Sequence, residues 1–208
     1  MEFSTFFAII IGVALINNYV LSKFLGLCPF LGVTKKMESA FGMGMAVVFV
    51  MTLASAVTWL IYNYLLREGN IFGVANLAPV LKTASYILVI ASLVQLVEMF
   101  LKKMVPALYQ SLGIYLPLIT TNCAIFGVAL LNTTDAPIAT QITQDNFLCA
   151  VSQGFAAGLG FTLVLILMAG IRERLEMADV PKALEGIPIT FISTGLMAFA
   201  FMGFMGLI

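Results

Sequence analysis

Six long apolar stretches, separated by short polar segments, constrain the fold of this chain more than any other feature. They cover roughly residues 3–22, 40–66, 83–101, 111–131, 147–171 and 188–207. A helix that crosses a bilayer needs about 20 apolar residues, because each residue adds about 1.5 Å against a hydrocarbon core about 30 Å thick. The sequence therefore predicts an all-α membrane protein with six transmembrane helices, in which residues 1–208 form a single integral membrane domain.

The composition agrees with a membrane protein and excludes several classes of function. Hydrophobic residues make up 62% of the chain and charged residues 10%, whereas soluble domains have roughly 45–50% and about 25%. The net charge is zero, so nothing indicates binding to nucleic acid. The absence of histidine excludes histidine-ligated haem and histidine-based zinc sites in this chain. The acidic start, MEFSTFF, lacks the positive charge of a signal peptide, so we interpret it as part of a retained span.

Basic residues are distributed unevenly between the loops and predict an orientation. Six spans place the first, third and fifth loops on one face of the membrane, and cytoplasmic loops carry an excess of Lys and Arg. The basic residues of those three loops are Lys35, Lys36, Lys102, Lys103, Arg172, Arg174 and Lys182. The opposite face has only Arg67 and Lys82. We therefore expect both termini on the non-cytoplasmic side.

Two short motifs with a cysteine at the same position indicate an internal repeat. LGLCPFLGV covers residues 25–33 and TTNCAIFGV covers 120–128. Aligned on Cys28 and Cys123, both read Cys-x-φ-φ-Gly-Val, where φ is apolar. Each motif belongs to a group of three spans, and because three is odd, the second group crosses the membrane in the opposite direction. The sequence thus predicts an inverted 3+3 repeat, about 1–104 and 105–208, that could bring the two cysteines close together.

Both motifs contain residues that interrupt plain helices. Pro29 has no amide donor and disfavours a helical conformation at Cys28. The flanking residues are Gly26, Gly32, Pro117 and Gly127. We predict broken helices at both cysteine motifs, whose freed backbone groups must be satisfied inside the protein. The polar residues suited to that task, or to hydrogen bonds between helices, are Asn17, Asn18, Thr120, Thr121 and Asn122.

Cys28 and Cys123 are the candidate metal ligands. A lone cysteine in an apolar helix is usually a small buried hydrophobe, which is our interpretation of Cys149. A disulfide between the paired cysteines is a further alternative, but it would not account for the broken helices. An iron–sulfur cluster or a zinc ion usually takes four ligands, and this chain supplies two at the expected site. A metal site would therefore require a partner chain with a matching pair of cysteines.

Glu98 is the one carboxylate well inside a predicted span. An ionisable residue in such a position is a candidate for an ion pathway. The alternative, which we favour, is that Glu98 lies near the cytoplasmic end and pairs with Lys102 at i+4. In a later span, residues 154–158 read GFAAG, a GxxxG motif that favours close helix packing within the chain or against a partner.

Three segments closely resemble one known family over nearly the whole chain. They are NNYVLSKFLGLCPFLGVTKKMESAFGMG, GIYLPLITTNCAIFGVALLN and IRERLEMADVPKALEGIPITFISTGLMAFAFMGF. The family contains the A-type subunits of Rnf complexes and the E-type subunits of Na⁺-translocating NADH:quinone reductases. LGLCPF and the preceding NNYVL are more similar to the Rnf members than to the quinone reductase members.

The resemblance implies a membrane electron-relay protein of an ion-translocating (Na⁺ or H⁺) ferredoxin:NAD⁺ oxidoreductase in the cytoplasmic membrane of a bacterium or archaeon. It implies one [2Fe–2S] cluster, held by Cys28, Cys123 and two cysteines of an inverted homologue of the E type. Further subunits of the B, C, D and G types complete the family's complex. Nothing resembles a flavinylation motif, so we expect no covalently bound flavin on this chain.

Three alternatives to this function remain open at the level of sequence. The first is the equivalent component of a Na⁺-translocating NADH:quinone reductase. The second is a small secondary transporter, which shares the inverted repeat and the broken helices but needs no paired cysteines. The third is a structural membrane scaffold, which predicts neither a metal nor alternating access.

Overall fold

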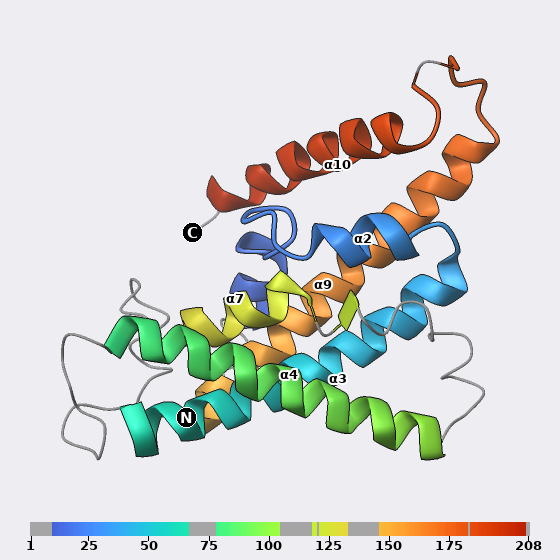
Figure 1. Cartoon of the computed structure of the whole chain (residues 1–208). Coiled ribbons are helices and arrows are strands. Elements are labelled where there is room, and N and C mark those ends of the chain that lie inside the picture. The colour runs from blue at the N-terminus through green and yellow to red at the C-terminus, as the bar shows by residue number, and fades with distance from the viewer. Residues whose placement is uncertain are drawn as a thin grey trace.

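The computed structural model describes residues 10–66, 78–104, 118–119, 121–132, 146–182 and 184–206. Every regular element in these ranges is helical, in agreement with the predicted all-α class. The long helices are α3 (Met37–Ile61), α4 (Ala78–Met104) and α9 (Phe147–Glu176). They lie together in Figure 1, and α10 (Ile187–Met202) lies at the opposite edge from α4.

Within the described residues, three helices are long and apolar enough to cross a membrane, namely Met37–Tyr64, Thr83–Phe100 and Phe147–Glu176. They confirm the second, third and fifth predicted spans, and α3 reaches its full length through the π-helical turn η2 (Tyr62–Leu66). The sixth predicted span corresponds to α10 and the short 3-10 helix η3 (Gly203–Gly206). The first and fourth predicted spans lie only partly within the described residues, so the count of six and the inverted repeat stay predictions.

The described part of the first predicted span is not one continuous helix. A π-helical turn, η1 (Gly12–Ile16), ends at Asn17, and turns without helix follow as far as Gly26. Asn18 satisfies backbone groups at this interruption, because its Oδ1 accepts a hydrogen bond from the Val20 N–H and its Nδ2 donates to the carbonyl oxygens of Ala14 and Gly160. This confirms the predicted role of Asn18 in satisfying the broken backbone.

Close backbone packing joins α3 to α9. A Cβ atom on Gly158 would lie 2.7 Å from the Cα of Val48, and one on Gly154 would lie 2.6 Å from the Cβ of Ser55. On the other helix, a Cβ on Gly44 would lie 2.5 Å from the Cγ2 of Thr162. Small residues let two helices approach closely where no aqueous hydrophobic effect drives them together. The GxxxG motif therefore serves packing within this chain.

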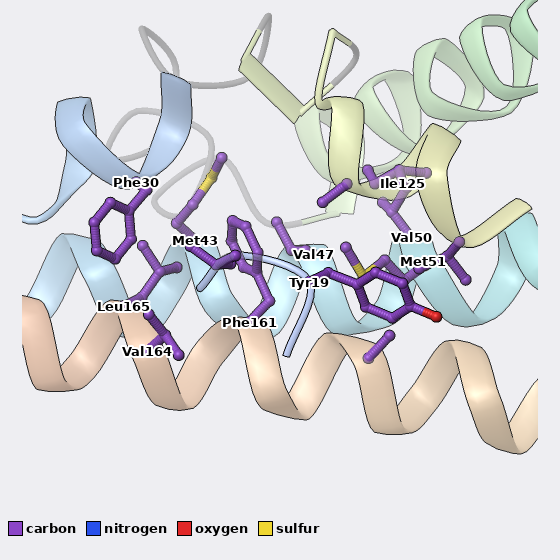
Figure 2. Packing of buried hydrophobic residues seen from close by; sticks show 14 of the residues in the cluster. Tyr19, Phe30, Met43, Val47, Val50, Met51, Ile125, Phe161, Val164 and Leu165 are labelled. Atoms are coloured by element: carbon purple, nitrogen blue, oxygen red, sulfur yellow. The ribbon is translucent and has the colours of Figure 1, made fainter. Parts of the chain in front are cut away.

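The buried core lies where two short helices rest on the α3–α9 pair (Figure 2). Helix α2 (Leu27–Val33) contributes Phe30, whose ring points toward Leu165 of α9 and is 0% exposed. Helix α7 (Cys123–Leu131) contributes Ile125, which lies near Val50 and Met51 of α3. These anchors fix the two helices that carry the candidate metal ligands.

Large apolar side chains cover the outer faces of α4 and α10. The most exposed on α4 and α10 are Leu88, Leu96, Met99, Ile187, Leu196 and Phe199. The buried face of α10 includes Thr190 and Thr194, whose hydroxyl groups donate to backbone carbonyl oxygens four residues earlier. A helix with its polar side chains inside and its apolar side chains outside suits contact with lipid or with another membrane protein.

Candidate metal centre

The break in the first cysteine motif lies before Cys28. Gly26, the N-cap of α2, has a φ of +80°, in the left-handed region that favours glycine. Cys28 and Pro29 are the second and third residues of α2 and are therefore helical. The expectation that Pro29 disfavours helix at Cys28 was wrong, because the first turn of a helix has no intrahelical partner for these amides and tolerates proline.

Helix α2 directs Cys28 away from the core. Pro29, Phe30 and Val33 are buried, whereas Cys28 is exposed. The apolar residues anchor the short helix on α3 and α9. The thiol consequently lies on the surface of this chain, where a second protein could reach it.

The second cysteine motif has the same arrangement. Cys123 is the first residue of α7 and is exposed. The helix begins there because Asn122 acts as N-cap: its Oδ1 accepts a hydrogen bond of 3.0 Å from the Ala124 N–H. Ala124 and Ile125 of the same turn are buried. The predicted role of Asn122 in satisfying freed backbone groups is thus confirmed, whereas Thr120 lies outside the described residues.

The two motifs meet at Gly26 and Cys123. The backbone N–H of Gly26 donates a hydrogen bond of 2.9 Å to the Sγ of Cys123. A Cβ on Gly26 would lie 2.7 Å from Cε2 of Phe161 and 3.0 Å from Oδ1 of Asn122. Glycine is therefore required both by its backbone conformation and by the lack of space. The structure brings together the starts of the two helices that carry Cys28 and Cys123.

The surroundings of Cys123 favour a negatively charged sulfur ligand. The positive end of the α7 dipole lies at Cys123, and the Gly26 N–H points at its sulfur. The Nδ2 of Asn122 is a buried donor with no hydrogen bond to a described residue. Hydrogen bonds to the sulfur atoms are among the features by which proteins tune iron–sulfur clusters. The donor set at this junction thus fits an anionic, sulfur-containing group.

All three cysteines are thiols, so Cys28 and Cys123 are not joined by a disulfide. Cys149, near the start of α9, is 0% exposed and lies within the packed interior. This confirms its interpretation as a small buried hydrophobe. Among the described residues, no group of three or more His, Cys, Asp or Glu side chains could hold a metal ion. A metal centre at Cys28 and Cys123 would therefore need ligands from outside the described part of the chain.

Glu98 lies on α4. It is half-buried and lines a cavity of 470 Å³ between α3 and α4, together with Phe41, Met45 and Val94. The expected pairing of Glu98 with Lys102 stays a prediction. A carboxylate in this largely apolar cavity keeps Glu98 as a candidate for an ion pathway.

Sequence reasoning missed one buried polar cluster. The Nδ2 of Asn132, at the end of α7, donates to the Oγ of Ser55 on α3, and that hydroxyl donates to the carbonyl oxygen of Ala150 on α9. Each of these residues is isolated in an apolar or loop sequence, so no spacing pattern connects them. The signal that could have indicated the cluster is the asparagine directly after the apolar run of the second cysteine motif.

Comparison with known proteins places the chain in one family. Residues 6–208 match the family described as "Rnf-Nqr subunit, membrane protein". The chain is 54% identical over 204 residues to the A-type component of the ion-translocating oxidoreductase complex of Azoarcus sp. (strain BH72), with 98% of each chain covered. It is 53% identical over 203 residues to the A-type component of the Na⁺-translocating ferredoxin:NAD⁺ oxidoreductase complex of Acetobacterium woodii, again with 98% of each covered.

A third relative, from Vibrio cholerae, shows a similar level of identity. The chain is 52% identical over 200 residues to the A-type component of the ion-translocating oxidoreductase complex of Vibrio cholerae, with 96% of each chain covered. The relatives align over almost their whole length, and the family match includes both cysteine motifs. The chain therefore belongs to the Rnf-Nqr family of membrane subunits.

Proposed function

We propose that this chain is the A-type component of an ion-translocating ferredoxin:NAD⁺ oxidoreductase complex and that it relays electrons within the membrane. Relatives at 52–54% identity are named as the A component of an ion-translocating oxidoreductase complex, and the relative from Acetobacterium woodii as that of a Na⁺-translocating ferredoxin:NAD⁺ oxidoreductase complex. The structural observation that carries the relay role is the hydrogen bond from the Gly26 N–H to the Cys123 Sγ. This bond joins the two cysteine motifs at a surface where both thiols are exposed.

Cys28 and Cys123 would hold one half of a [2Fe–2S] cluster. When bound, the cluster would supply a one-electron relay, which divides the crossing of a hydrocarbon core about 30 Å thick. Two further thiolates would come from an inverted homologue of the E type that covers the exposed faces of α2 and α7. Because both cysteines are already on the surface of this chain, such a partner needs no rearrangement of the core to reach them.

The residues around the cysteines have distinct tasks in this proposal. Gly26 donates its N–H to the sulfur of Cys123, and Asn122 fixes the first turn of α7. Phe30 and Ile125 anchor α2 and α7 in the core, so that the thiols keep their positions. These two buried side chains also keep water away from the core side of the two helices. The buried Nδ2 of Asn122 is a further donor available to a bound acceptor.

In the membrane, the chain would form six spans as an inverted 3+3 repeat with both termini on the non-cytoplasmic side. Three long apolar helices and the interrupted helices before Cys28 and Cys123 support this arrangement. Lys102 and Lys103 at the end of α4, and Arg172 and Arg174 near the end of α9, would then face the cytoplasm. Subunits of the B, C, D and G types would complete the complex, which moves Na⁺ or H⁺.

The test is the cluster inventory of the purified membrane complex that contains this chain. Iron, acid-labile sulfide and the EPR spectrum of the reduced complex are measured for the wild type, Cys28→Ser, Cys123→Ser and the matched control Cys149→Ser. We expect both surface variants to lose one [2Fe–2S] signal and the control to keep it. An unchanged inventory in assembled Cys28→Ser and Cys123→Ser complexes would overturn the relay.

The same experiment separates the alternative functions. A secondary transporter or a scaffold requires no iron at Cys28 and Cys123, so the cysteine variants would keep every cluster. The equivalent component of a NADH:quinone reductase would also lose the cluster, but electrons would reach a quinone rather than pass between ferredoxin and NAD⁺. Assays with both acceptors on the wild-type complex distinguish these two oxidoreductases.

A further inference from the structure

A buried polar cluster lies at the end of α7 that is farther from the cysteines. Asn132 is the C-cap of α7 and is 0% exposed. Its Nδ2 donates to the Oγ of Ser55, which is also 0% exposed and donates to the carbonyl oxygen of Ala150. The cluster joins α3, α7 and α9. Buried polar groups inside a membrane protein are energetically costly unless other protein groups satisfy them, because no water is present to do so.

The hydrogen bonds fix the orientation of the Asn132 amide. Ser55 has a single hydroxyl proton, and the Ala150 carbonyl oxygen takes it. The Ser55 oxygen must therefore accept from Asn132, and only the Nδ2 of Asn132 can donate. A flipped amide would place two acceptors against each other. The Oδ1 of Asn132 is thus the atom left over, and it is buried with no hydrogen bond to a described residue.

The environment of this oxygen is suited to a monovalent cation. A buried carbonyl oxygen is destabilising unless a donor or a cation occupies its lone pairs. The Oγ of Ser55, which accepts from the Asn132 Nδ2, is a second buried oxygen beside it. The negative end of the α7 dipole also lies at Asn132. The two candidate ligands, Asn132 and Ser55, are neutral oxygens, which compensate a single positive charge better than a double one.

We propose that the Oδ1 of Asn132, with the hydroxyl oxygen of Ser55, forms part of a binding site for a Na⁺ ion. The C-terminal ends of helices recur among the Na⁺ ligands of membrane transporters, because their carbonyl groups and dipole favour a cation. The site lies roughly 13 Å along α7 from Cys123, at about 1.5 Å per residue. The inference rests on the proposed membership of an ion-translocating complex, but it does not depend on the cluster.

The test is the Na⁺ dependence of the purified complex and of the complex in membrane vesicles. The melting temperature is followed as NaCl replaces choline chloride at constant ionic strength, and coupled ²²Na⁺ uptake is measured over the same range. Asn132→Leu removes the oxygen ligand, and we expect the Na⁺ concentration for half-maximal response to rise about ten- to hundredfold. Ser55→Ala keeps the amide of Asn132, and we expect a smaller rise in the same direction.

Two controls keep the test informative. Thr52→Ala removes a hydroxyl from α3 that donates to the Val48 carbonyl oxygen, and its Na⁺ response should match the wild type. Asn132→Asp keeps an oxygen at the site and should keep the Na⁺ response even if Asn132→Leu does not assemble. An unchanged Na⁺ dependence in assembled Asn132→Leu or Ser55→Ala complexes would overturn the site, as would a wild-type complex without any response to Na⁺.

The cluster signal of these variants separates the two proposals. Asn132→Leu and Ser55→Ala should keep the [2Fe–2S] EPR signal, whereas Cys28→Ser and Cys123→Ser should keep the Na⁺-dependent rise in melting temperature. Loss of Na⁺ dependence with an intact cluster signal supports the cation site alone. Loss of the cluster with an intact Na⁺ response supports the relay alone.

Discussion

The backbone N–H of Gly26 donates a 2.9 Å hydrogen bond to the Sγ of Cys123, which lies 97 residues later in the chain. Gly26 is the N-cap of α2, and Cys123 is the first residue of α7. This single bond therefore links the starts of both cysteine-bearing helices. The packing at this contact leaves no room for a side chain on Gly26, because Phe161 and Asn122 already occupy the space around its Cα atom.

Gly26→Ala is expected to destabilise the junction of the two motifs. An alanine in the left-handed region is strained by about 1–2 kcal/mol, and its Cβ would lie 2.7 Å from the Phe161 ring. We expect a lower melting temperature and less [2Fe–2S] per assembled complex. The matched control is Gly195→Ala on α10, where a Cβ would have no atom within 4 Å. Equal cluster content in both variants would contradict this account of Gly26.

Phe30→Ala tests whether the position of Cys28 depends on the anchor of α2 in the core. Phe30 is 0% exposed, so its truncation leaves a cavity and costs about 3–5 kcal/mol. We expect thermal denaturation at a lower temperature and a weaker cluster signal, because α2 would no longer hold Cys28 in one place. Phe30→Leu fills most of the cavity and should restore much of the signal. A full signal in Phe30→Ala would show that the partner protein positions Cys28.

The sequence was sufficient to predict the helical class, three of the long spans and the backbone-satisfying roles of Asn18 and Asn122. These features depend on local composition and on residues that satisfy or interrupt a backbone in hydrocarbon. The exact break was not predictable from Pro29, because the first turn of α2 tolerates proline and the left-handed Gly26 ends the preceding turns. The contact between Gly26 and Cys123 depends on tertiary packing over a long sequence separation.

The buried cluster at Asn132 illustrates the same limit. A serine in the middle of α3 and an asparagine after α7 have no sequence pattern in common, and only the packing of α3, α7 and α9 brings them together. By contrast, the glycines of the GFAAG motif were interpretable because the small residues recur on one face of a helix. The spacing of residues within one helix can therefore be predicted from sequence, whereas the contacts between residues on different helices cannot.

Gly158→Ala is expected to separate α3 from α9. Its Cβ would lie 2.7 Å from the Cα of Val48, which is backbone and cannot rotate away. Overpacking of this kind costs about 1–3 kcal/mol, and we expect a melting temperature several degrees lower for the complex in detergent. Gly170→Ala on the same helix is the matched control, because its nearest atom would be the flexible Met37 side chain at 3.7 Å. Equal stability of the two variants would contradict the close-packing role.

Glu98→Gln tests whether the carboxylate in the cavity between α3 and α4 belongs to an ion pathway. Glutamine keeps the size and the hydrogen-bonding capacity of the side chain but cannot carry the negative charge. If a cation or proton passes by Glu98, coupled ion uptake by vesicles should fall while electron transfer between ferredoxin and NAD⁺ continues, because Glu98 is not one of the proposed cluster ligands. Glu38→Gln, in the exposed first turn of α3, is the matched control and should leave both activities unchanged. Uptake at the wild-type level in Glu98→Gln would limit Glu98 to a structural role on α4.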